Sequence, residues 1–303
     1  MTVSYVKMGN SDLTFSRIIP GLMRLLEWKL SKEELSRWIH VCYEMGITTF
    51  DHADIYGSYR CEEVFGEALA LTPSLRNKFQ FVTKCGIALV SPNRPDHTIR
   101  HFITSKEHII ASAERSLRNL HTDHLDVLLI HRPDPLMNAD DVAAALIELK
   151  KSGKVLYFGV SNFLPFHFDL LQSRLDFPLV TNQIEFSVTH TEPFYDGSLD
   201  QAQRLRLPPM IWSPVGGGKL FTSDDERSVR VRSALQKVAD EIDGASLDQI
   251  ALAWTMQHPA KPLPVLGTGK LERIKAAIDA EDIQLTRQQW FTIREASAGP
   301  EIP

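Results

Sequence analysis

Cysteine, excess charge of one sign and long apolar runs are all scarce in this chain of 303 residues. Its three cysteines, Cys42, Cys61 and Cys85, are odd in number and lack paired spacing, which argues against a disulfide framework and indicates a reducing, cytoplasmic environment. The net charge of -5 disfavours nucleic acid or an anionic membrane as partner, because both demand a basic face. The longest apolar stretches are strand-sized, far short of the roughly 20 residues of a membrane span.

A glycine-rich dinucleotide-binding turn is also missing after the first predicted strand. Gly9 and Gly21 do not give the required spacing, and the run Gly216-Gly217-Gly218 comes late in the chain. The chain has instead a repeated alternation of short apolar runs with longer segments of helical periodicity. The eight predicted strands cover residues 18–22, 47–51, 79–84, 125–131, 155–160, 179–183, 210–213 and 263–267.

Segments with helical patterns follow these strands. Ser31 and Glu34 predict a capping box at the start of one helix, and Gly153 is placed to end another in a left-handed conformation. Repeated βα units predict a parallel sheet, and eight of them in this length favour a closed barrel over an open doubly wound sheet. We therefore expect one α/β domain over residues 1–303, a (β/α)₈ TIM barrel whose extra C-terminal helices and loops help to form the site.

Polar side chains stand where three of the apolar strands end. Asp51 ends the second strand with Tyr56 just beyond it, Lys84 ends the third, and His131 follows the fourth. Alone, Asp51 is equally suited to cap a helix, and a lone histidine such as His131 is more often structural than catalytic, but a lysine that ends a buried run needs a partner. Because active sites of such barrels lie at the carboxyl ends of the strands, the four side chains are expected to meet there.

These four residue types suit the reduction of a carbonyl group, which needs a hydride at carbon and a proton at oxygen. A tyrosine hydroxyl is a weak acid at neutral pH, and a nearby Lys84 ammonium would lower its pKa while Asp51 holds the lysine. His131 could bind the carbonyl oxygen and orient it toward Tyr56. The grouping of the four does not follow from their spacing alone.

Four motifs make the chain similar to a known family. They are Phe50-Asp51-His52-Ala53-Asp54-Ile55-Tyr56-Gly57, Thr83-Lys84, Leu129-Ile130-His131-Arg132-Pro133-Asp134 and Gly159-Val160-Ser161-Asn162-Phe163. In their order and their places at strand ends they closely resemble the aldo-keto reductase superfamily, and the resemblance covers essentially the whole chain. It implies an NADPH-dependent oxidoreductase that reduces aldehydes or ketones, with Tyr56, Asp51, Lys84 and His131 as the catalytic tetrad and Tyr56 as the proton donor.

The same resemblance implies the cofactor site. Ser161, Asn162 and Gln183 would hold the nicotinamide carboxamide, and Trp212 stands where the family usually has another aromatic residue that packs on the nicotinamide. The segment after it would wrap the pyrophosphate, and the last loop would meet the adenosine phosphate. The residues of these two segments are Ser213, Pro214, Val215 and Gly217, then Gly267, Thr268, Lys270 and Arg273.

The choice of cofactor depends on the last loop. Well-known members of the family carry Pro-Lys-Ser there, whereas this chain has Leu266-Gly267-Thr268 and keeps the arginine, Arg273, that meets the 2′-phosphate. NADPH is therefore predicted over NADH. The substrate pocket is expected to be largely apolar, although each of its members could equally be loop packing; they are Leu22, Met23, Trp28 and Tyr59.

Two other functions remain open from the sequence. A metal-dependent barrel hydrolase would use Asp51, His52, Asp54 and His131 as ligands, but it leaves Lys84 unexplained and no spaced ligand set supports it, so no metal is predicted. A cofactor-binding regulatory barrel with little turnover would share the tetrad. Cys85 is expected to be a buried, inert thiol because adjacent strand residues point to opposite sides. The expected partner is a small carbonyl compound, and the expected assembly is a monomer or a weak homo-oligomer.

Overall fold

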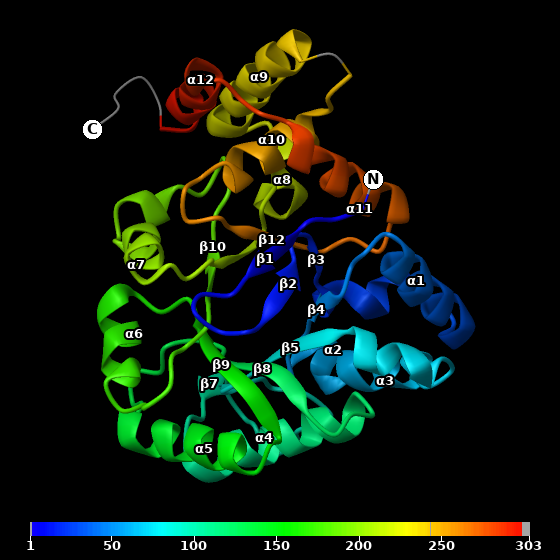
Figure 1. The fold of residues 1–303 in the computed structure, drawn as a ribbon, viewed down its shortest axis with the longest axis vertical. Helices are drawn as coiled ribbons and strands as arrows, with labels where there is room; N and C mark the ends of the chain where they lie inside the picture. The colour runs from blue at the N-terminus through cyan, green and yellow to red at the C-terminus, as the bar shows by residue number, and fades with distance from the viewer. Residues whose placement is uncertain (1, 243, 299–303) are drawn as a thin grey trace.

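The computed structural model describes residues 2–242 and 244–298, and over these residues strands and helices alternate as predicted (Figure 1). An isolated parallel bridge between Gly21 and Asp51 brings the two edges of the main sheet together, so that the sheet closes into the predicted (β/α)₈ barrel. In the described part of the chain this sheet has eight parallel strands, in the spatial order β3 (Ile19–Pro20), β12 (Leu263–Leu266), β11 (Met210–Trp212), β10 (Asn182–Glu185), β9 (Val155–Ser161), β8 (Leu125–Ile130), β5 (Gln80–Cys85) and β4 (Thr49–Asp51).

Helices surround the barrel and begin where the sequence indicates. Ser31 accepts a hydrogen bond from the Glu34 backbone N–H while the Glu34 carboxylate accepts one from Ser31 N, which confirms the capping box. Gly153 has a φ of 71°, as a left-handed helix end requires. The outer helices are α1 (Lys32–Glu44), α2 (Tyr56–Tyr59), α3 (Cys61–Leu69), α4 (Lys106–Asn119), α5 (Ala139–Lys151), α6 (Pro165–Gln172), α7 (Ser198–Leu205) and α11 (Leu271–Asp279).

An N-terminal hairpin that the sequence did not predict closes the amino-terminal end of the barrel. Strands β1 (Tyr5–Lys7) and β2 (Thr14–Ser16) pair antiparallel, and Phe15 is fully buried. Its apolar side chains form one cluster with barrel residues such as Val82 and Leu129. The barrel interior is therefore apolar at the hairpin end, which leaves polar interior positions for the opposite end.

A second helical layer lies at one end of the molecule (Figure 1). Trp254 and Trp290 stack with ring centroids 4.7 Å apart, and each indole N–H donates to the other residue's carbonyl at 3.0 and 3.1 Å. This reciprocal pair ties two of the predicted extra helices together around their own apolar cluster. The helices of this layer are α8 (Lys219–Thr222), α9 (Glu226–Glu241), α10 (Leu247–Met256) and α12 (Arg287–Ala298).

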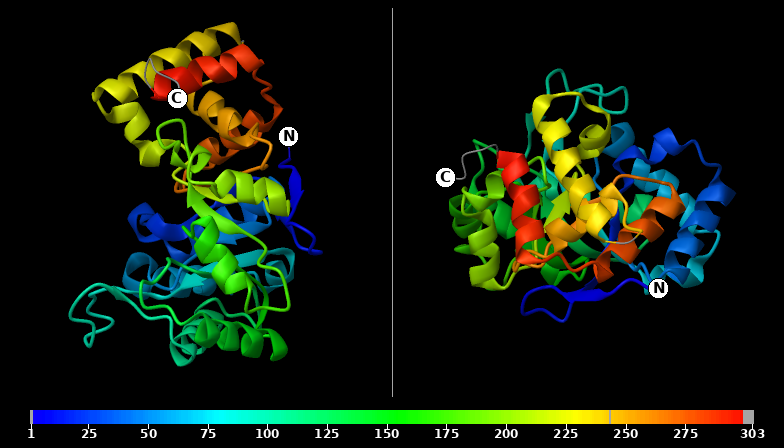
Figure 2. Two further views of the ribbon diagram at one scale, coloured as in Figure 1. Left: turned by 90° about the vertical axis from the view of Figure 1, so that its left-hand side faces the viewer. Right: turned by 90° about the horizontal axis from the view of Figure 1, so that it is seen from above.

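The segment between β5 and α4 forms a small antiparallel pair of its own, β6 (Ile87–Ala88) with β7 (His101–Phe102), which the sequence did not predict. Figure 2 (left) shows this teal segment and the yellow helix α9 projecting from one side of the barrel, with the blue N-terminal hairpin on the opposite side. Among the helices of residues 2–242 and 244–298, none has the length and apolarity that crossing a membrane requires.

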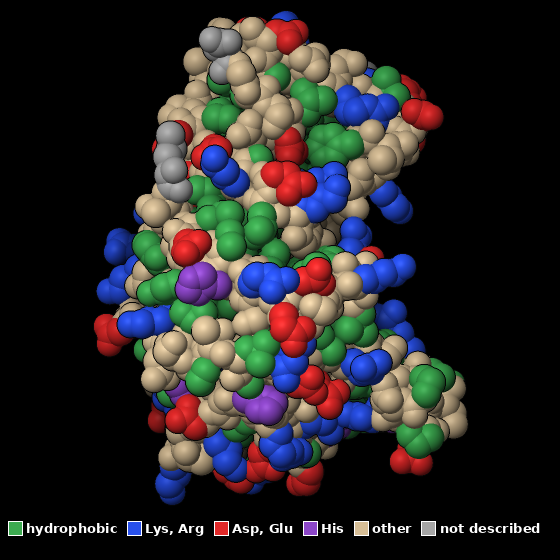
Figure 3. All heavy atoms as spheres, turned by 90° about the vertical axis from the view of Figure 1, so that its right-hand side faces the viewer, with side chains coloured by type: hydrophobic (Ala, Val, Ile, Leu, Met, Phe, Trp, Pro, Cys, Tyr) green, Lys and Arg blue, Asp and Glu red, His purple; other side chains and the backbone are tan. Residues whose placement is uncertain are grey.

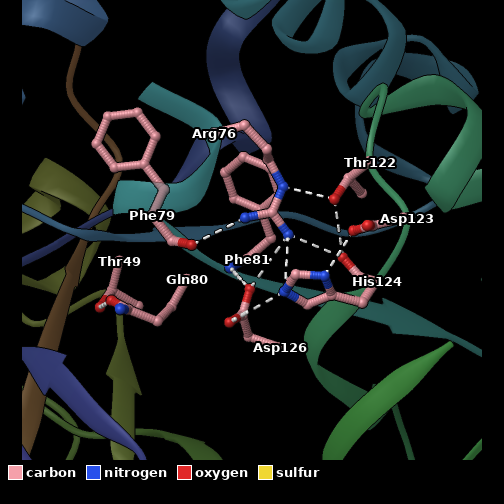
Figure 4. A network of polar contacts seen from close by, with 9 residues as sticks. All are labelled: Thr49, Arg76, Phe79, Gln80, Phe81, Thr122, Asp123, His124 and Asp126. Atoms are coloured by element: carbon pink, nitrogen blue, oxygen red, sulfur yellow. Dashed lines mark hydrogen bonds and ion pairs between the residues drawn. The ribbon is translucent and has the colours of Figure 1, made fainter. Parts of the chain in front are cut away.

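A closed polar network holds the amino-terminal ends of β5 and β8 (Figure 4). Arg76, just before β5, donates to the carbonyl oxygens of Phe79 at 3.0 Å and His124 at 2.9 Å. Its guanidinium also lies 3.6 Å from Asp126, whose carboxylate accepts a hydrogen bond from Phe81 N at 2.8 Å. Donors and acceptors of this network are used among themselves, which suits a structural role.

Candidate active site

The carboxyl ends of the strands open into a cavity of about 920 Å³. It lies on the side opposite the N-terminal hairpin, and Figure 3 shows a recess in the outline of the molecule on that side, with Lys and Arg side chains at its edge. Most of the residues predicted for the site line this cavity: Met23, Asp51, Tyr56, His131, Ser161, Asn162, Gln183, Trp212, Ser213, Pro214, Val215, Gly217, Gly267, Thr268 and Arg273.

Lys84 lies beneath the cavity floor and is fully buried. Its ammonium donates to both carboxylate oxygens of Asp51, at 2.7 and 2.8 Å, and to the carbonyl oxygen of His52 at 2.7 Å. It also donates to the Tyr56 hydroxyl oxygen at 3.0 Å. The Asp51 carboxylate neutralises the buried ammonium. Along β5, Val82 and Lys84 point into the barrel while Phe81 and Cys85 point outward, so the strand itself directs the Lys84 side chain toward the barrel interior.

The direction of the Lys84–Tyr56 hydrogen bond decides what the phenol can do. Because the ammonium donates to the phenolic oxygen, the phenolic hydrogen stays available for an acceptor in the cavity. The His131 ring meets the Tyr56 ring edge-on, with centroids 6.1 Å apart, and lines the same cavity. A carbonyl oxygen that lies between the two rings would therefore find a hydrogen-bond donor on the Tyr56 side.

Burial and charge act against each other on Tyr56. Burial raises its pKa, and the Lys84 ammonium opposes this rise, so that the pKa ends above its ordinary value. The sequence correctly gives the sign of the lysine's contribution, but the net lowering it predicts is wrong here because desolvation outweighs the ammonium. Lys84 shows the opposite balance: burial lowers its pKa, but Asp51 and Tyr56 together raise it above its ordinary value.

His131 is neutral at physiological pH. Burial and the positive charges of Lys84, Arg132 and Arg100 lower its pKa well below the ordinary value. Its Nδ1 atom is buried and has no partner among the described residues. A neutral imidazole that keeps one nitrogen on the cavity side can hydrogen-bond a substrate oxygen without adding charge.

The backbone turns sharply immediately after Tyr56. Gly57 has a φ of 55°, and a Cβ there would lie 2.6 Å from Cys61 Sγ and 2.7 Å from a methyl group of Leu26. Ser58 and Tyr59 follow with φ of 54° and 70°, a conformation that costs free energy in residues with a side chain. Only glycine fits at position 57, and this tight turn fixes where the Tyr56 hydroxyl lies.

The amide-bearing residues form a connected set beside the tetrad. Ser161 donates to the Gln183 carbonyl oxygen at 3.0 Å, and Asn162 Nδ2 donates to Ser161 Oγ at 2.7 Å. Trp212 Nε1 donates to Asn162 Oδ1 at 2.9 Å, a bond that an indole provides and that orients its ring. Gln183 Nε2 donates to Asp51 Oδ1 at 2.7 Å, which leaves Gln183 Oε1 for a donor outside this set.

The far end of the cavity is built from a glycine-rich turn and the start of α11. Gly216, Gly217 and Gly218 have φ of 62°, 63° and 90°, so the chain there takes a course that side chains would strain. Arg273 lies in the first turn of α11, is exposed, and forms no ion pair with the described residues. Thr268 Oγ1 accepts a hydrogen bond from Lys270 N at 3.2 Å.

Besides Lys84, which lies beneath the floor, four predicted site residues do not line the cavity. Leu22 is fully buried in the main core, and Trp28 packs against Trp38 and Gly269 instead. Tyr59 is buried and its hydroxyl accepts a hydrogen bond from Leu89 N at 2.8 Å, so it supports the segment after β6. Lys270 is the N-cap residue of α11 and lies outside the lining. These side chains therefore pack within the protein or lie outside the cavity, instead of contacting a substrate or cofactor as predicted.

Sequence reasoning missed several cavity residues. Arg132 follows His131 directly, so its place at a strand end was a usable signal, whereas Arg100 lies in the segment before β7 and carried none. Leu247 and Leu252 come from α10, far along the chain, and are brought to the cavity only by the second helical layer.

Two other residues that were weighed, His52 as a metal ligand and Cys85 as a reactive thiol, lie outside the cavity. His52 contacts Phe65 and Phe81 on the outer side of the strand, and burial lowers its pKa to about 3. Cys85 faces the same way, and burial raises the pKa of its thiol well above the ordinary value. Within residues 2–242 and 244–298, no group of three His, Cys, Asp or Glu side chains is arranged to hold a metal ion.

The chain is similar to known proteins over nearly its whole length. The model of the "Aldo/keto reductase family" matches residues 17–298. An uncharacterized oxidoreductase of Bacillus subtilis is 55% identical over 96% of this chain and 97% of its own length. A 6-dehydroglucose reductase of Agrobacterium fabrum is 44% identical over 97% of this chain and 98% of its own. The glycerol dehydrogenase of Gluconobacter oxydans, 23% identical, has the same fold, with a TM-score of 0.84 over 98% of this chain and 96% of that one.

Proposed function

This chain belongs to the aldo/keto reductase family and is a pyridine-nucleotide-dependent oxidoreductase, and from that premise we propose that it uses NADPH to reduce an aldehyde or ketone to an alcohol, with Tyr56 as the proton donor. The observation that carries the proposal is the hydrogen bond from Lys84 to the Tyr56 oxygen, which leaves the phenolic hydrogen for a substrate. The matched relatives are named as oxidoreductases. Neither their names nor the Lys84–Tyr56 hydrogen bond supports the metal-dependent hydrolase.

The proton donor works through three neighbours. The protonated phenol donates to the carbonyl oxygen, and the Lys84 ammonium stabilises the phenolate that remains. Asp51 keeps the ammonium in place and balances its charge. Neutral His131 holds the carbonyl oxygen near Tyr56, so that the proton moves over a short, fixed path.

The residues beside the tetrad fit a nicotinamide nucleotide. Gln183 Oε1 can accept from a primary amide while its nitrogen stays on Asp51, and the ring of Trp212, oriented by Asn162, offers a flat surface for stacking. Arg273, which has no ion-pair partner in the part of the chain that the structure describes, would meet the 2′-phosphate that distinguishes NADPH from NADH. When bound, the cofactor supplies the hydride that is added to the carbonyl carbon.

The test is the loss of NADPH absorbance with a panel of aldehydes, comparing the native protein with Tyr56→Phe. General-acid catalysis predicts that kcat falls by about 10²–10⁴-fold in the variant while NADPH binding, followed by fluorescence, changes little. A variant that reduces the same aldehydes at the native rate would exclude Tyr56 as the donor. Tight NADPH binding without turnover of any aldehyde would favour the regulatory alternative, and failure to bind either nucleotide would refute the proposal.

A further inference from the structure

Two arginines stand at the carbonyl end of the cavity and have no part in the proposed proton transfer. Arg132 directly follows His131 at the end of β8, and Arg100 directly precedes β7. Both line the cavity together with Tyr56 and His131. The two guanidiniums are close enough that each lowers the pKa of His131 and that Arg100 also lowers the pKa of the partly buried Arg132.

The charge of this pair is incompletely balanced by the protein. Some arginines on the outside of the barrel have carboxylate partners, as in Arg174–Asp140 at 2.8 Å and Arg230–Glu226 at 2.9 Å. Among the described residues, neither Arg100 nor Arg132 forms an ion pair.

The remaining charges near the pair do not cancel it. The carboxylate whose charge acts on Arg132 is that of Glu185, which is itself 3.8 Å from His190. The positive charge of Lys84 is balanced by Asp51, with which Lys84 forms a buried ion pair at 2.7 Å. Two guanidiniums and one nearby carboxylate, that of Glu185, leave this end of the cavity with a net positive charge.

The Arg132 side chain is held in a defined place. Its guanidinium lies 5.5 Å from the centroid of the Trp212 ring, and that ring is fixed by the hydrogen bond to Asn162. A guanidinium that rests on an aromatic face keeps its N–H edge free for a planar, two-oxygen acceptor. Like charges that face a cavity without a partner carry a cost that an anionic ligand would remove.

We propose that Arg132 and Arg100 bind an oxyanion group of the substrate, so that the preferred substrates are aldehydes or ketones that carry a carboxylate or a phosphate near the carbonyl. This inference rests on the proposed function, because it assigns the substrate class of the same site. The anion binds the guanidinium edges while the carbonyl oxygen lies between His131 and Tyr56. Neutral aldehydes of the same size lose this anchor but keep the chemistry.

Matched substrates test the proposal with the holoenzyme. 4-Carboxybenzaldehyde is compared with its methyl ester, and glyceraldehyde 3-phosphate with glyceraldehyde, by NADPH oxidation. A charge-assisted, two-point contact predicts that kcat/KM for the anionic member exceeds that of the neutral one by about tenfold or more, mostly through KM. The preference for the anionic substrate should shrink as salt is added. The substrate pair with the larger preference shows whether the site favours a carboxylate or a phosphate.

Variants then assign the preference to the two arginines. In Arg132→Ala and Arg100→Ala the advantage of the anionic substrates should fall to about twofold or less, while kcat/KM for the neutral aldehydes changes by less than about threefold. Arg132→Lys should keep part of the advantage of the anionic substrates, because lysine retains the positive charge but not the planar pair of N–H donors. Arg174→Ala, which removes an exposed guanidinium paired with Asp140, is the control and should behave as the native protein.

The outcomes separate this inference from the proposed function. Reduction of neutral and anionic aldehydes at equal kcat/KM would overturn the oxyanion site and leave the reductase standing, as would equal losses for both substrates in Arg132→Ala. If no aldehyde is reduced, calorimetry of 4-(hydroxymethyl)benzoate binding to the NADP⁺-loaded protein still tests the oxyanion site. Binding that Arg132→Ala weakens about tenfold supports the site, and the absence of binding refutes it.

Discussion

Strands β5 and β8 carry a polar network at each end, and the two networks differ in what they leave unused. At the amino-terminal end, Arg76 bonds Phe79, His124 and Asp126, and the network closes on itself (Figure 4). At the carboxyl end, Lys84 is likewise fully engaged, but the groups around it are not. The Tyr56 hydroxyl group and two arginines, Arg100 and Arg132, line the cavity, and among the described residues neither arginine forms an ion pair.

The difference separates stability from function along the same pair of strands. A closed network lowers the free energy of the folded chain and offers nothing to a ligand. A half-open one holds its members by burial and hydrogen bonds while it keeps selected donors for a substrate. We expect substitutions in the first network to affect unfolding and substitutions in the second to affect turnover.

Lys84→Met should give the largest effect. It removes the group that stabilises the Tyr56 phenolate and leaves the Asp51 carboxylate buried without its counter-charge, so kcat should fall by roughly 10²-fold or more. The free energy of unfolding should fall by about 3–5 kcal/mol. The double variant Asp51→Asn/Lys84→Met should regain stability without regaining activity, as chemical denaturation and NADPH oxidation would measure. Recovery of both together would mean that the pair is only structural.

Arg76→Ala is the counterpart at the other end of the strands. Loss of the bonds to Phe79 and His124 and of the ion pair with Asp126 should lower the free energy of unfolding by about 2–3 kcal/mol. At temperatures where the variant is folded, kcat and KM should equal the native values. A fall in kcat comparable with that of Lys84→Met would contradict the division between the two ends.

Arg273→Ala tests the far end of the cavity, where the arginine side chain is exposed. Its loss should raise the KM for NADPH by about tenfold, the strength of one charge-assisted phosphate contact, and leave the KM for NADH unchanged. Steady-state kinetics with both nucleotides measure the difference. An unchanged KM for NADPH would show that the 2′-phosphate lies elsewhere.

The pH dependence should show the smallest effect. The active form of Tyr56 is protonated, and its pKa is raised above about 10, so activity is lost only as the pH rises past that value. The active form of His131 is neutral, and its lowered pKa moves the acid limb well below about pH 6.5. Between these limits kcat for aldehyde reduction should change by less than about twofold. A midpoint near pH 7 would mean that another group controls the proton.

Much of the fold was predictable because its signals are local. Apolar runs of strand length and capping residues such as Ser31 depend on a few neighbouring residues, and all eight barrel strands were found. The hairpin β1–β2 and the pair β6–β7 were missed because their strands are only two or three residues long. Such short strands carry no periodicity and form only against the barrel.

The candidate site was predictable to a lesser degree. Tyr56, Lys84 and Asp51 were picked from the ends of strands, a position that the sequence reveals. Trp28 and Tyr59 were placed in the pocket because they are large and near it in sequence, but each packs against a segment distant along the chain, Gly269 and Leu89 respectively. Arg100 was missed because its segment, just before β7, comes to the cavity only through tertiary folding.

By itself the sequence determined the order of strands and helices and the chemical types at the strand ends, because hydrophobic period and side-chain chemistry belong to each segment alone. Only the tertiary structure decided which of these groups meet. Barrel closure brings Gln183 to Asp51 across 132 positions of the chain, and the net pKa of Tyr56 depends on how deeply that closure buries it. Distances, burial and opposing charges are properties of the packed molecule, so they had to be read from its structure.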